Sequence, residues 1–366
     1  MTDTYMREAL ELASRGCGVT SPNPAVGCVI VRDREVVGRG FHTWAGVDHA
    51  EIIALREAGA AADGSTMYVT LEPCFHQGRT GPCVDAVLRA GVRRVVAAMQ
   101  DPNPEVSGKS FAKLREAGVE VLLDDAYTSE AGRLNEAFVH FMQTGRPLVT
   151  IKAALTLDGK IAAPQDNVGW ITSEVARADV QQVRHFSDAI LTGLGTVLED
   201  DCLLTDRSGR DRARPLLRIV LDSQLRIPLK SKMITSAVGD VLVVGTSAGS
   251  RERRNALENA GIRVLIADGP GGRTDPRKVL DFLAKERYLS LMVEAGSKVN
   301  WTMLDTGIAD KVLFYYAPKI LGGLESLPVA GGKGRLRRID AIQLHRLTVH
   351  TVSKDEFAVE AYVAKA

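Results

Sequence analysis

The apolar positions in the first 145 residues follow helical and strand periods in alternation. Residues 3–16 carry a helical stripe of apolar side chains (Met6, Ala9, Leu10 and Ala13), and Gly16 follows as a stop signal. Further helices are predicted over residues 49–59, 83–90, 107–117 and 126–144. Strands are predicted over residues 26–32, 35–40, 66–71, 93–98 and 119–123. Such alternation predicts an α/β domain in which helices cover a sheet.

After Gly145-Arg-Pro147 the pattern starts again with a strong strand, and we place a boundary there between domains 1–145 and 147–366. Strands are predicted over 148–154, 189–192, 217–221, 240–244, 263–267, 290–294 and 312–316, and helices over 173–186, 250–260, 276–286 and 297–305. Two closing strands, 343–352 and 356–364, have no helix between them, which predicts a mixed sheet. The Gly/Pro cluster at 269–276 is expected to be a surface loop.

Composition narrows the class of protein. At 366 residues the chain exceeds what one core usually serves, which supports two domains. Its 46 Lys and Arg nearly cancel 45 Asp and Glu, so we expect a small, polar or phosphorylated substrate and no nucleic acid. The chain has no apolar run of about 18 residues and no signal-peptide start, so we expect a cytoplasmic protein without a membrane partner. Thiols stay reduced in that compartment, and Cys17, Cys28 and Cys202 are expected to be small buried apolar residues.

Four residues of the first domain carry the chemistry of a metal site. His49 and Glu51 open the predicted helix 49–59, while Cys74 and Cys83 follow the next strand, near the start of another helix. One imidazole and two thiolates bind zinc and leave the fourth tetrahedral position open for water, and helix N-termini favour the thiolate form. Zinc-bound water loses a proton near neutral pH, and Glu51, not needed as a ligand, suits proton transfer. His-x-Glu followed by Pro-Cys therefore predicts a zinc deaminase.

The spacing of the two cysteines departs from the common deaminase motif. Eight residues separate Cys74 from Cys83, where the common motif has two. A purely structural zinc site is the main alternative, but it normally has four protein ligands, and His76 is the only nearby candidate for a fourth. His76 is alternatively a substrate contact. A nucleic-acid base deaminase is a further alternative, which the neutral charge and the long inter-cysteine loop disfavour.

Several motifs of the chain resemble one known family. They are, in chain order, Ser21-Pro-Asn-Pro-Ala-Val-Gly27, His49-Ala-Glu51, Glu72-Pro-Cys-Phe-His-Gln-Gly-Arg-Thr-Gly-Pro-Cys83 and Asp101-Pro-Asn-Pro104. They closely resemble the bifunctional deaminase/reductase of bacterial riboflavin biosynthesis, in which a long inter-cysteine loop with a His and a basic residue is normal. The resemblance covers essentially the whole chain. It implies a cytidine-deaminase-like three-layer domain followed by a dihydrofolate-reductase-like mixed-sheet domain.

For the first domain the resemblance implies deamination of 2,5-diamino-6-(5-phosphoribosylamino)pyrimidin-4-one by zinc hydroxide, with the three zinc ligands and Glu51 in the roles given above. Asn23 matches the residue that hydrogen-bonds the pyrimidine, and His42, His76 and Arg79 are candidates for the ribose and phosphate. For His42 a structural role is an equal alternative. Many relatives have Lys where Arg79 stands, and because both side chains are cationic, phosphate binding survives the exchange.

The second half has few catalytic signals of its own. Gly193-Leu-Gly195-Thr196 and Glu294-Ala-Gly-Ser-Lys298 each follow a predicted strand and open a helix, which suits a phosphate. No Gly-x-Gly-x-x-Gly with an acidic residue about 20 positions later is present, which disfavours an ordinary dinucleotide-binding fold. Its matches to the family include Lys152-Ala-Ala-Leu-Thr-Leu-Asp-Gly-Lys-Ile161, Trp170-Ile-Thr172, Asp188-Ala-Ile-Leu-Thr-Gly193, Leu203-Leu-Thr-Asp-Arg207 and Glu294-Ala-Gly296.

These matches imply a reductase that converts the ribosyl group of 5-amino-6-(5-phosphoribosylamino)uracil to ribityl with NADPH. The preference for NADPH over NADH comes from the family alone. The matches place the cofactor contacts at Ala154, Trp170, Thr196, Asp200, Ser223 and Gly296. They place the substrate contacts at Arg184, Leu204, Arg207 and Glu294. For the two arginines, a surface salt bridge is the alternative.

Val168 departs from the family pattern. Relatives usually have Gly-x-Ser-x-Trp, and here the stretch is Asp166-Asn-Val-Gly-Trp170. The missing hydroxyl removes one polar contact, typically about 0.5–1.5 kcal/mol, and Val168 is kept as a residue that lines the substrate site. A second half that is only a binding or dimerisation module is the narrower alternative. We also expect a homo-oligomer.

Overall fold

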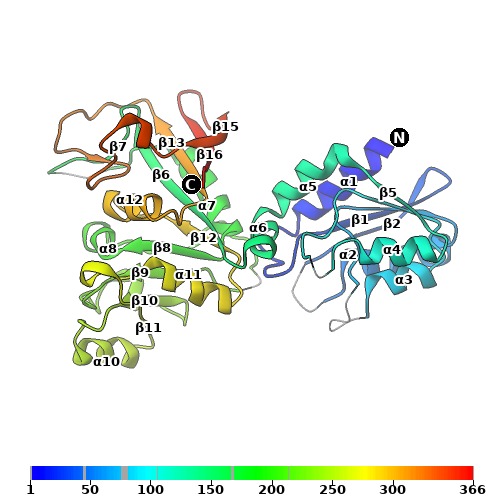
Figure 1. Cartoon of the computed structure of the whole chain (residues 1–366), viewed down its shortest axis with the longest axis horizontal. Helices are drawn as coiled ribbons and strands as arrows, with labels where there is room; N and C mark the ends of the chain where they lie inside the picture. The colour runs from blue at the N-terminus through cyan, green and yellow to red at the C-terminus, as the bar shows by residue number, and fades with distance from the viewer. Residues whose placement is uncertain are drawn as a thin grey trace. The chain divides into compact units, whose positions relative to one another are not determined.

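The computed structural model describes residues 2–43, 47–75, 81–104, 106–165, 169–212 and 214–365. The chain forms two compact units. One comprises residues 1–145 with the short segment 211–214, and the other comprises residues 146–210 and 215–366. Each unit has its own main sheet (Figure 1).

The first unit is built on a five-stranded sheet in the order β2-β1-β3-β4-β5, with β1 antiparallel to β2 and β3, and β3, β4 and β5 parallel. The strands are β1 (Gly27–Arg32), β2 (Glu35–Phe41), β3 (Thr66–Val69), β4 (Arg94–Ala97) and β5 (Glu120–Leu123). The helices are α1 (Thr2–Ser14), α2 (Ala50–Ala58), α3 (Cys83–Arg89), α4 (Lys109–Glu116), α5 (Thr128–Leu134) and α6 (Glu136–Thr144). Helices α1 and α5 cover one face and α2, α3 and α4 cover the other, so the unit has three layers (Figure 1).

Two glycines of β2 allow α2 to lie directly against the sheet. A Cβ atom on Gly40 would stand 2.1 Å from the carbonyl oxygen of Ala50, and one on Gly38 would stand 2.2 Å from that of Ala54. Backbone atoms cannot move aside as a flexible side chain can, so this close approach requires glycine. The N-terminus of α2, which follows His49, is thereby held against β2.

The helical pattern over residues 126–144 forms two helices, α5 and α6, and the single helix predicted there is wrong. The break lies at Asn135, which is buried. Its side chain donates a hydrogen bond to the carbonyl oxygen of Ala25 at 2.9 Å and accepts one from the amide of Ala25 at 2.7 Å. This pairing satisfies backbone groups of the segment before β1, which helical periodicity does not reveal. Helix α6 ends at Gly145 as predicted, with a left-handed φ of 72°.

The second unit is built on a nine-stranded sheet in the order β11-β10-β9-β8-β12-β6-β13-β16-β15. Its strands are β6 (Leu148–Thr156), β8 (Ala189–Gly193), β9 (Leu217–Leu221), β10 (Val241–Gly245), β11 (Arg263–Ile266), β12 (Ser290–Val293), β13 (Lys311–Ala317), β15 (Leu344–Thr351) and β16 (Phe357–Val363). Its helices are α7 (Glu174–Phe186), α8 (Leu194–Asp200), α9 (Lys232–Thr235), α10 (Arg251–Asn259), α11 (Pro276–Lys285) and α12 (Ser297–Asp305). The block from β11 to β13 is parallel and β16 and β15 are antiparallel, which confirms the predicted mixed sheet.

The central strands of this sheet are buried on both faces. Every residue of β8, β10 and β12 is buried, which explains why the sequence shows these strands as continuous apolar runs. Helix α9 and the paired strands β7 (Lys160–Ala162) and β14 (Leu327–Pro328) were not predicted. They span only four, three and two residues, too few to show a period.

The cysteines outside the metal motif differ in burial. Cys28 is fully buried as predicted, but Cys17 and Cys202 are only half-buried, so that prediction is wrong for them. Both lie just after a helix end, where the backbone leaves the core: Cys17 follows α1, and Cys202 follows α8 and lines a cleft. Within the part of the chain that the structure describes, no helix has the length and apolar character needed to cross a membrane.

Candidate active sites

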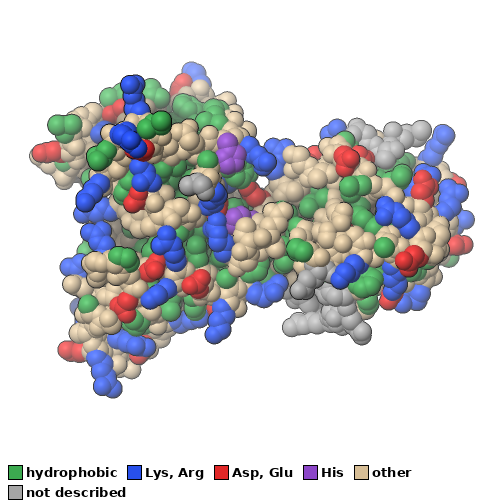
Figure 2. All heavy atoms as spheres, in the orientation of Figure 1, with side chains coloured by type: hydrophobic (Ala, Val, Ile, Leu, Met, Phe, Trp, Pro, Cys, Tyr) green, Lys and Arg blue, Asp and Glu red, His purple; other side chains and the backbone are tan. Residues whose placement is uncertain are grey.

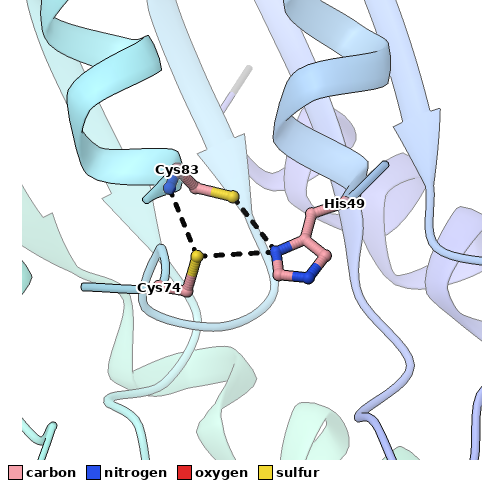
Figure 3. Close-up of side chains that lie close together, drawn as sticks. All are labelled: His49, Cys74 and Cys83. Atoms are coloured by element: carbon pink, nitrogen blue, oxygen red, sulfur yellow. Dashed lines mark hydrogen bonds between the residues drawn. The ribbon is translucent and has the colours of Figure 1, made fainter. Parts of the chain in front are cut away.

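Three side chains of the first unit converge at the starts of two helices. His49 immediately precedes α2, Cys83 is the first residue of α3, and Cys74 lies in the segment after β3, with the three side chains pointing toward one another (Figure 3). The Nδ1 atom of His49 lies 3.2 Å from Sγ of Cys83 and 3.5 Å from Sγ of Cys74. Cys74 follows β3 and Cys83 begins α3, the next helix along the chain, so two residues nine positions apart share one site.

The geometry of this cluster fits a zinc ion. The three donor atoms lie within 4.8 Å of one another and form the one group of potential metal ligands among the described residues. A nitrogen and a sulfur bound tetrahedrally to one Zn²⁺, at about 2.1 and 2.3 Å, are about 3.6 Å apart. The observed separations of 3.2 and 3.5 Å approach that value. Three protein ligands leave one coordination position open, which is typical of catalytic zinc sites.

Hydrogen bonds prepare one thiol of this cluster for metal binding. The Cys83 thiol, the His49 imidazole and the backbone N–H of Cys83 lower the pKa of Cys74 to about 4. The N–H group lies 3.2 Å from Sγ of Cys74 and belongs to the first turn of α3, where we expected the helix N-terminus to favour a thiolate. The thiolate is the form that binds a metal.

Glu51 lies beside this cluster in the first turn of α2 and is only 3% exposed. Burial raises the pKa of its carboxyl group to about 7; the negative charge of Cys74 adds to this shift, and the charge of His49 opposes it. A carboxyl group with a pKa near neutrality both takes up and releases protons at that pH. Glu51 is not among the grouped donor atoms, which is consistent with a proton carrier rather than a ligand.

Glu72 is a buried carboxylate whose role the sequence did not reveal. Its two oxygens accept hydrogen bonds, at 2.9–3.4 Å, from the backbone amides of Asp101, Gly108, Ser110 and Phe111. Two of these amides belong to the first turn of α4, where a negative charge also balances the partial positive charge of the helix end. Glu72 therefore anchors the chain immediately before Pro73-Cys74. The signal in the sequence that could have indicated this role was an acidic residue directly before Pro73-Cys74.

Asn23 and His42 meet each other near the metal cluster. The Nδ2 atom of Asn23 lies 3.1 Å from Nε2 of His42, and Nδ1 of His42 lies 3.2 Å from the carbonyl oxygen of Asp48. Because a carbonyl only accepts, Nδ1 carries the proton and Nε2 accepts from Asn23. Both ring nitrogens of His42 thus have protein partners, which favours the structural alternative for this residue. His76 and Arg79 lie outside the described residues.

A cleft of about 1960 Å³ in the second unit contains the predicted reductase residues. Ten of them are described and all ten line it: Ala154, Trp170, Thr196, Asp200, Ser223 and Gly296 for the cofactor, and Arg184, Leu204, Arg207 and Glu294 for the substrate. Val168 lies outside the described residues. The sequence positions of these residues are widely spaced, so only the fold brings them together.

The sheet topology explains why these residues share one cleft. Strands β9, β8 and β12 are parallel neighbours, and Ser223, Thr196 and Gly296 follow their carboxyl ends. Ligands of open α/β sheets bind at this edge. Gly296 also immediately precedes α12, whose free backbone amides suit the phosphates of a dinucleotide. The residues present therefore fit NADPH.

A network of two buried cations and the partly exposed Glu294 forms part of the cleft. Lys152 Nζ lies 3.1 Å from one carboxylate oxygen of Glu294, and Arg184 Nη2 lies 2.9 Å from the other. Burial raises the pKa of Glu294, but the charges of Lys152 and Arg184 outweigh it and hold this pKa at about 2. The Arg184 side chain is 8% exposed, so a surface salt bridge is wrong for this arginine. Lys152 had no role predicted from the sequence, although a lysine within the apolar strand β6 was an available signal.

Comparison with known proteins identifies the family. Residues 1–99 match the cytidine and deoxycytidylate deaminase zinc-binding region, and residues 147–355 match the RibD C-terminal domain. Riboflavin biosynthesis protein RibD of Actinobacillus pleuropneumoniae is 41% identical over 357 residues, which cover 97% of this chain and 94% of the relative. The chain belongs to the RibD family.

Solved structures of RibD proteins agree with this assignment. RibD of Acinetobacter baumannii, form 1, has a TM-score of 0.88 at 36% identity, covering 100% of this chain and 99% of that one. A diaminohydroxyphosphoribosylaminopyrimidine deaminase/5-amino-6-(5-phosphoribosylamino)uracil reductase of Thermotoga maritima has a TM-score of 0.84 at 34% identity, with 99% of each chain covered. Both likenesses span the deaminase and the reductase sequence.

Membership of the RibD family makes the chain a bifunctional enzyme of riboflavin biosynthesis, with zinc and NADPH as cofactors and small phosphorylated pyrimidines as substrates. It confirms the predicted fold, a cytidine-deaminase-like domain followed by a dihydrofolate-reductase-like domain. A reductase domain also contradicts the alternative of a second half that only binds or dimerises. The long loop between the cysteines was therefore a correct signal for this branch of the zinc deaminases.

Proposed function

We propose that residues 1–145 deaminate 2,5-diamino-6-(5-phosphoribosylamino)pyrimidin-4-one and that residues 147–366 reduce the resulting 5-amino-6-(5-phosphoribosylamino)uracil. The reduction converts the ribosyl group to ribityl. The observation that carries this proposal is that each unit contains a candidate site of its own. The first has the His-Cys-Cys cluster beside a buried glutamate, and the second has one cleft lined by the ten described reductase residues.

In the first unit the His-Cys-Cys cluster holds zinc, which when bound activates a water molecule. Glu51 takes one proton from the attacking water and gives it to the ring nitrogen beside the reacting carbon. It then moves the proton of the new hydroxyl group to the 2-amino group, which leaves as ammonia. A pKa of about 7 suits Glu51 to both directions of transfer. Asn23, oriented by His42, hydrogen-bonds the pyrimidine.

The ribose and phosphate of the deaminase substrate are assigned to His76 and Arg79. Both residues lie in the loop between the two cysteines. Their assignment rests on the resemblance of this loop to the family motif. A cation in this loop supplies the charge that a phosphate needs.

In the second unit NADPH when bound supplies the hydride, and the protein orients the reactants. We assign the cofactor to Ala154, Trp170, Thr196, Asp200, Ser223 and Gly296. Glu294 remains a carboxylate and accepts hydrogen bonds from substrate hydroxyl groups. Arg184 is held by Glu294 and by the carbonyl oxygen of Thr205, whereas the exposed Arg207 lines the cleft and forms no ion pair with a described residue, so we assign the substrate phosphate to Arg207. Leu204 and Val168 complete the lining.

The test follows NADPH in the full chain supplied with zinc. With the diaminopyrimidine substrate, we expect the wild-type chain to consume NADPH only after deamination. Glu51→Gln should lower that consumption by about 10²–10⁴-fold, because the proton carrier is lost, and should leave reduction of the deaminated uracil unchanged. Glu294→Gln is the matched control, which should release ammonia normally and reduce the uracil poorly. The proposal would be contradicted if Glu51→Gln consumed NADPH at the wild-type rate with the diaminopyrimidine. It would also be contradicted if the wild-type chain failed to consume NADPH with either substrate.

We also propose a cytoplasmic homo-oligomer that binds no nucleic acid. Its cysteines are all free thiols, which supports a reducing compartment. Acidic and basic side chains are interspersed over the face shown in Figure 2, in keeping with a formal charge of +1. Retention of RNA by the protein at low salt would contradict the proposal that it binds no nucleic acid. Support for an oligomer comes from β15, an edge strand whose residues are all exposed, Leu344, Leu347 and Val349 included.

A further inference from the structure

The segment Leu203–Arg207 lies between α8 and β9 and has neither helix nor strand. It carries two assigned substrate residues, Leu204 and Arg207, to the cleft of the second unit. Leu204 is buried and has a left-handed φ of 52°, which a residue with a Cβ atom rarely adopts. Such a conformation persists only where surrounding contacts determine it.

Buried arginines hold the carbonyl groups on both sides of Leu204. Arg218 Nη1 donates a hydrogen bond to the carbonyl oxygen of Leu203 at 3.0 Å. Arg184 Nη1 donates one to the carbonyl oxygen of Thr205, also at 3.0 Å. Both arginines are buried in the second unit, so buried side chains hold this half of the segment.

Two side chains of α7 hold the other half of the segment, around Arg207. The amide of Arg207 donates to Oε1 of Gln181 at 2.8 Å. The amide of Ser208 donates to Oδ1 of Asp206 at 2.9 Å. The second carboxylate oxygen of Asp206 lies 3.0 Å from Nδ1 of His185. The peptide groups before and after Arg207 are therefore both tied to α7.

The pair of His185 and Asp206 is buried, with side chains 2% and 7% exposed. A buried ionisable pair has a desolvation cost that often matches its attraction, so it is weak evidence of a stabilising role. Neither residue is among those that line the cleft, but Asp206 directly precedes Arg207, whose exposed side chain does line it. This placement favours a role in the conformation of the segment.

We propose that His185 and Asp206 are positioning residues of the reductase, which fix the backbone on both sides of Arg207 and so aim its guanidinium at the substrate phosphate. This inference rests on the proposed assignment of Arg207 to that phosphate. Because neither residue contacts the reacting groups, their loss changes the binding of the uracil substrate and leaves hydride transfer from bound NADPH intact.

The experiment uses Asp206→Asn and His185→Gln in the full chain. We expect the reductase KM for 5-amino-6-(5-phosphoribosylamino)uracil to rise about tenfold, because a small displacement of a binding group is costly. The reductase kcat and the Kd for NADPH, measured by fluorescence, should remain unchanged. The matched control is Glu258→Gln, the same change of acid to amide in an exposed pair with Arg254 at 2.8 Å on α10, which should leave all three values unchanged.

A double variant, His185→Gln with Asp206→Asn, supplies a rescue. Its two amides can form a hydrogen bond with each other, so the KM should rise less than the two single effects combined. A KM that stays at the wild-type value in both single variants would overturn the proposal. So would a parallel loss of kcat and NADPH binding, because that pattern indicates a general structural role.

Arg207→Met separates this inference from the function on which it rests. If Arg207→Met leaves the KM for the phosphorylated uracil unchanged, the phosphate assignment fails, and the positioning role fails with it. If Arg207→Met raises the KM but Asp206→Asn does not, the assignment stands and only the positioning role is overturned. A rise in KM in both variants, with kcat retained in Asp206→Asn, supports the inference.

Discussion

Glu51 and Cys83 lie at the same candidate zinc site and do different chemistry in the proposed mechanism. Glu51 is a buried acid with its pKa raised to about 7, and Cys83 contributes a sulfur 3.2 Å from the His49 nitrogen. A ligand and a proton carrier can both be essential for turnover. Zinc content distinguishes them, because loss of a ligand lowers metal affinity far more than loss of a neighbouring proton carrier.

We predict that Glu51→Gln retains zinc and loses deamination, whereas Cys83→Ser loses zinc as well. The first change removes the proton carrier and leaves all three donor atoms, and the second replaces a thiolate by a poor ligand for this metal. Metal analysis of the purified, dialysed chains measures the difference. Cys17→Ser, at a half-buried cysteine outside the site, is the control and should keep its zinc.

Two outcomes would contradict these assignments. Zinc loss in Glu51→Gln would mean that the glutamate is a ligand. Full zinc content and full activity in Cys83→Ser would remove that cysteine from the site.

At the scale of elements, the close packing of α2 on β2 determines where the metal site can form. His49 precedes α2, and this helix approaches the sheet through glycine positions that leave no room for a Cβ atom. The contact made by Gly40 is with backbone, the carbonyl oxygen of Ala50, so a larger residue would displace the helix start itself.

We predict that Gly40→Ala destabilises the deaminase domain by about 1–3 kcal/mol and weakens zinc binding, because the new Cβ atom pushes α2 away from β2. Gly132→Ala is the matched control. It lies in α5, where a Cβ atom meets nothing within 4 Å and φ is not positive, so it should be neutral or stabilise by up to about 1 kcal/mol. Denaturant unfolding and zinc titration measure both effects. Equal stability of the two variants would disprove this account of the packing.

The longer elements follow from the sequence because a period needs several residues to show. Helix α1 carries such a period, whereas the buried parallel strands appear as continuous apolar runs; these elements and the two closing strands were all predicted near their observed bounds. The break between α5 and α6 at Asn135 was not predicted, because it depends on a partner, Ala25, that is 110 positions away. Helix α9 and strands β7 and β14 are too short to be recognised by period.

At the scale of the whole molecule, the exposed edge strand β15 bears on assembly. An unpaired edge is a template for another strand, and proteins usually cover or interrupt such edges. Pairing of such an edge with the same strand of a second copy, around a two-fold axis, would give a closed dimer. The exposed apolar residues on β15, such as Leu347 at 58% exposed, suit burial in that contact.

We predict that the wild-type chain is a dimer or a larger closed oligomer in solution and that Leu347→Asp weakens the association, because a charge placed in the contact loses its water. Light scattering across a concentration series measures the mass. Val238→Asp is the control, since Val238 is 80% exposed and lies far along the chain from β15. A wild-type chain that stays monomeric at high concentration would contradict the prediction.

By itself, the sequence determined the α/β organisation, the mixed sheet and the His-Cys-Cys motif. Periodicity and motif spacing are local properties, and they survive without knowledge of the fold. Only the tertiary structure decided which distant polar groups meet: Glu72 with the start of α4, Lys152 with Glu294, and His185 with Asp206. Those contacts depend on strand order and on the close approach of helices to the sheet. They form where burial leaves a polar group no water to bind, so each must find a protein partner.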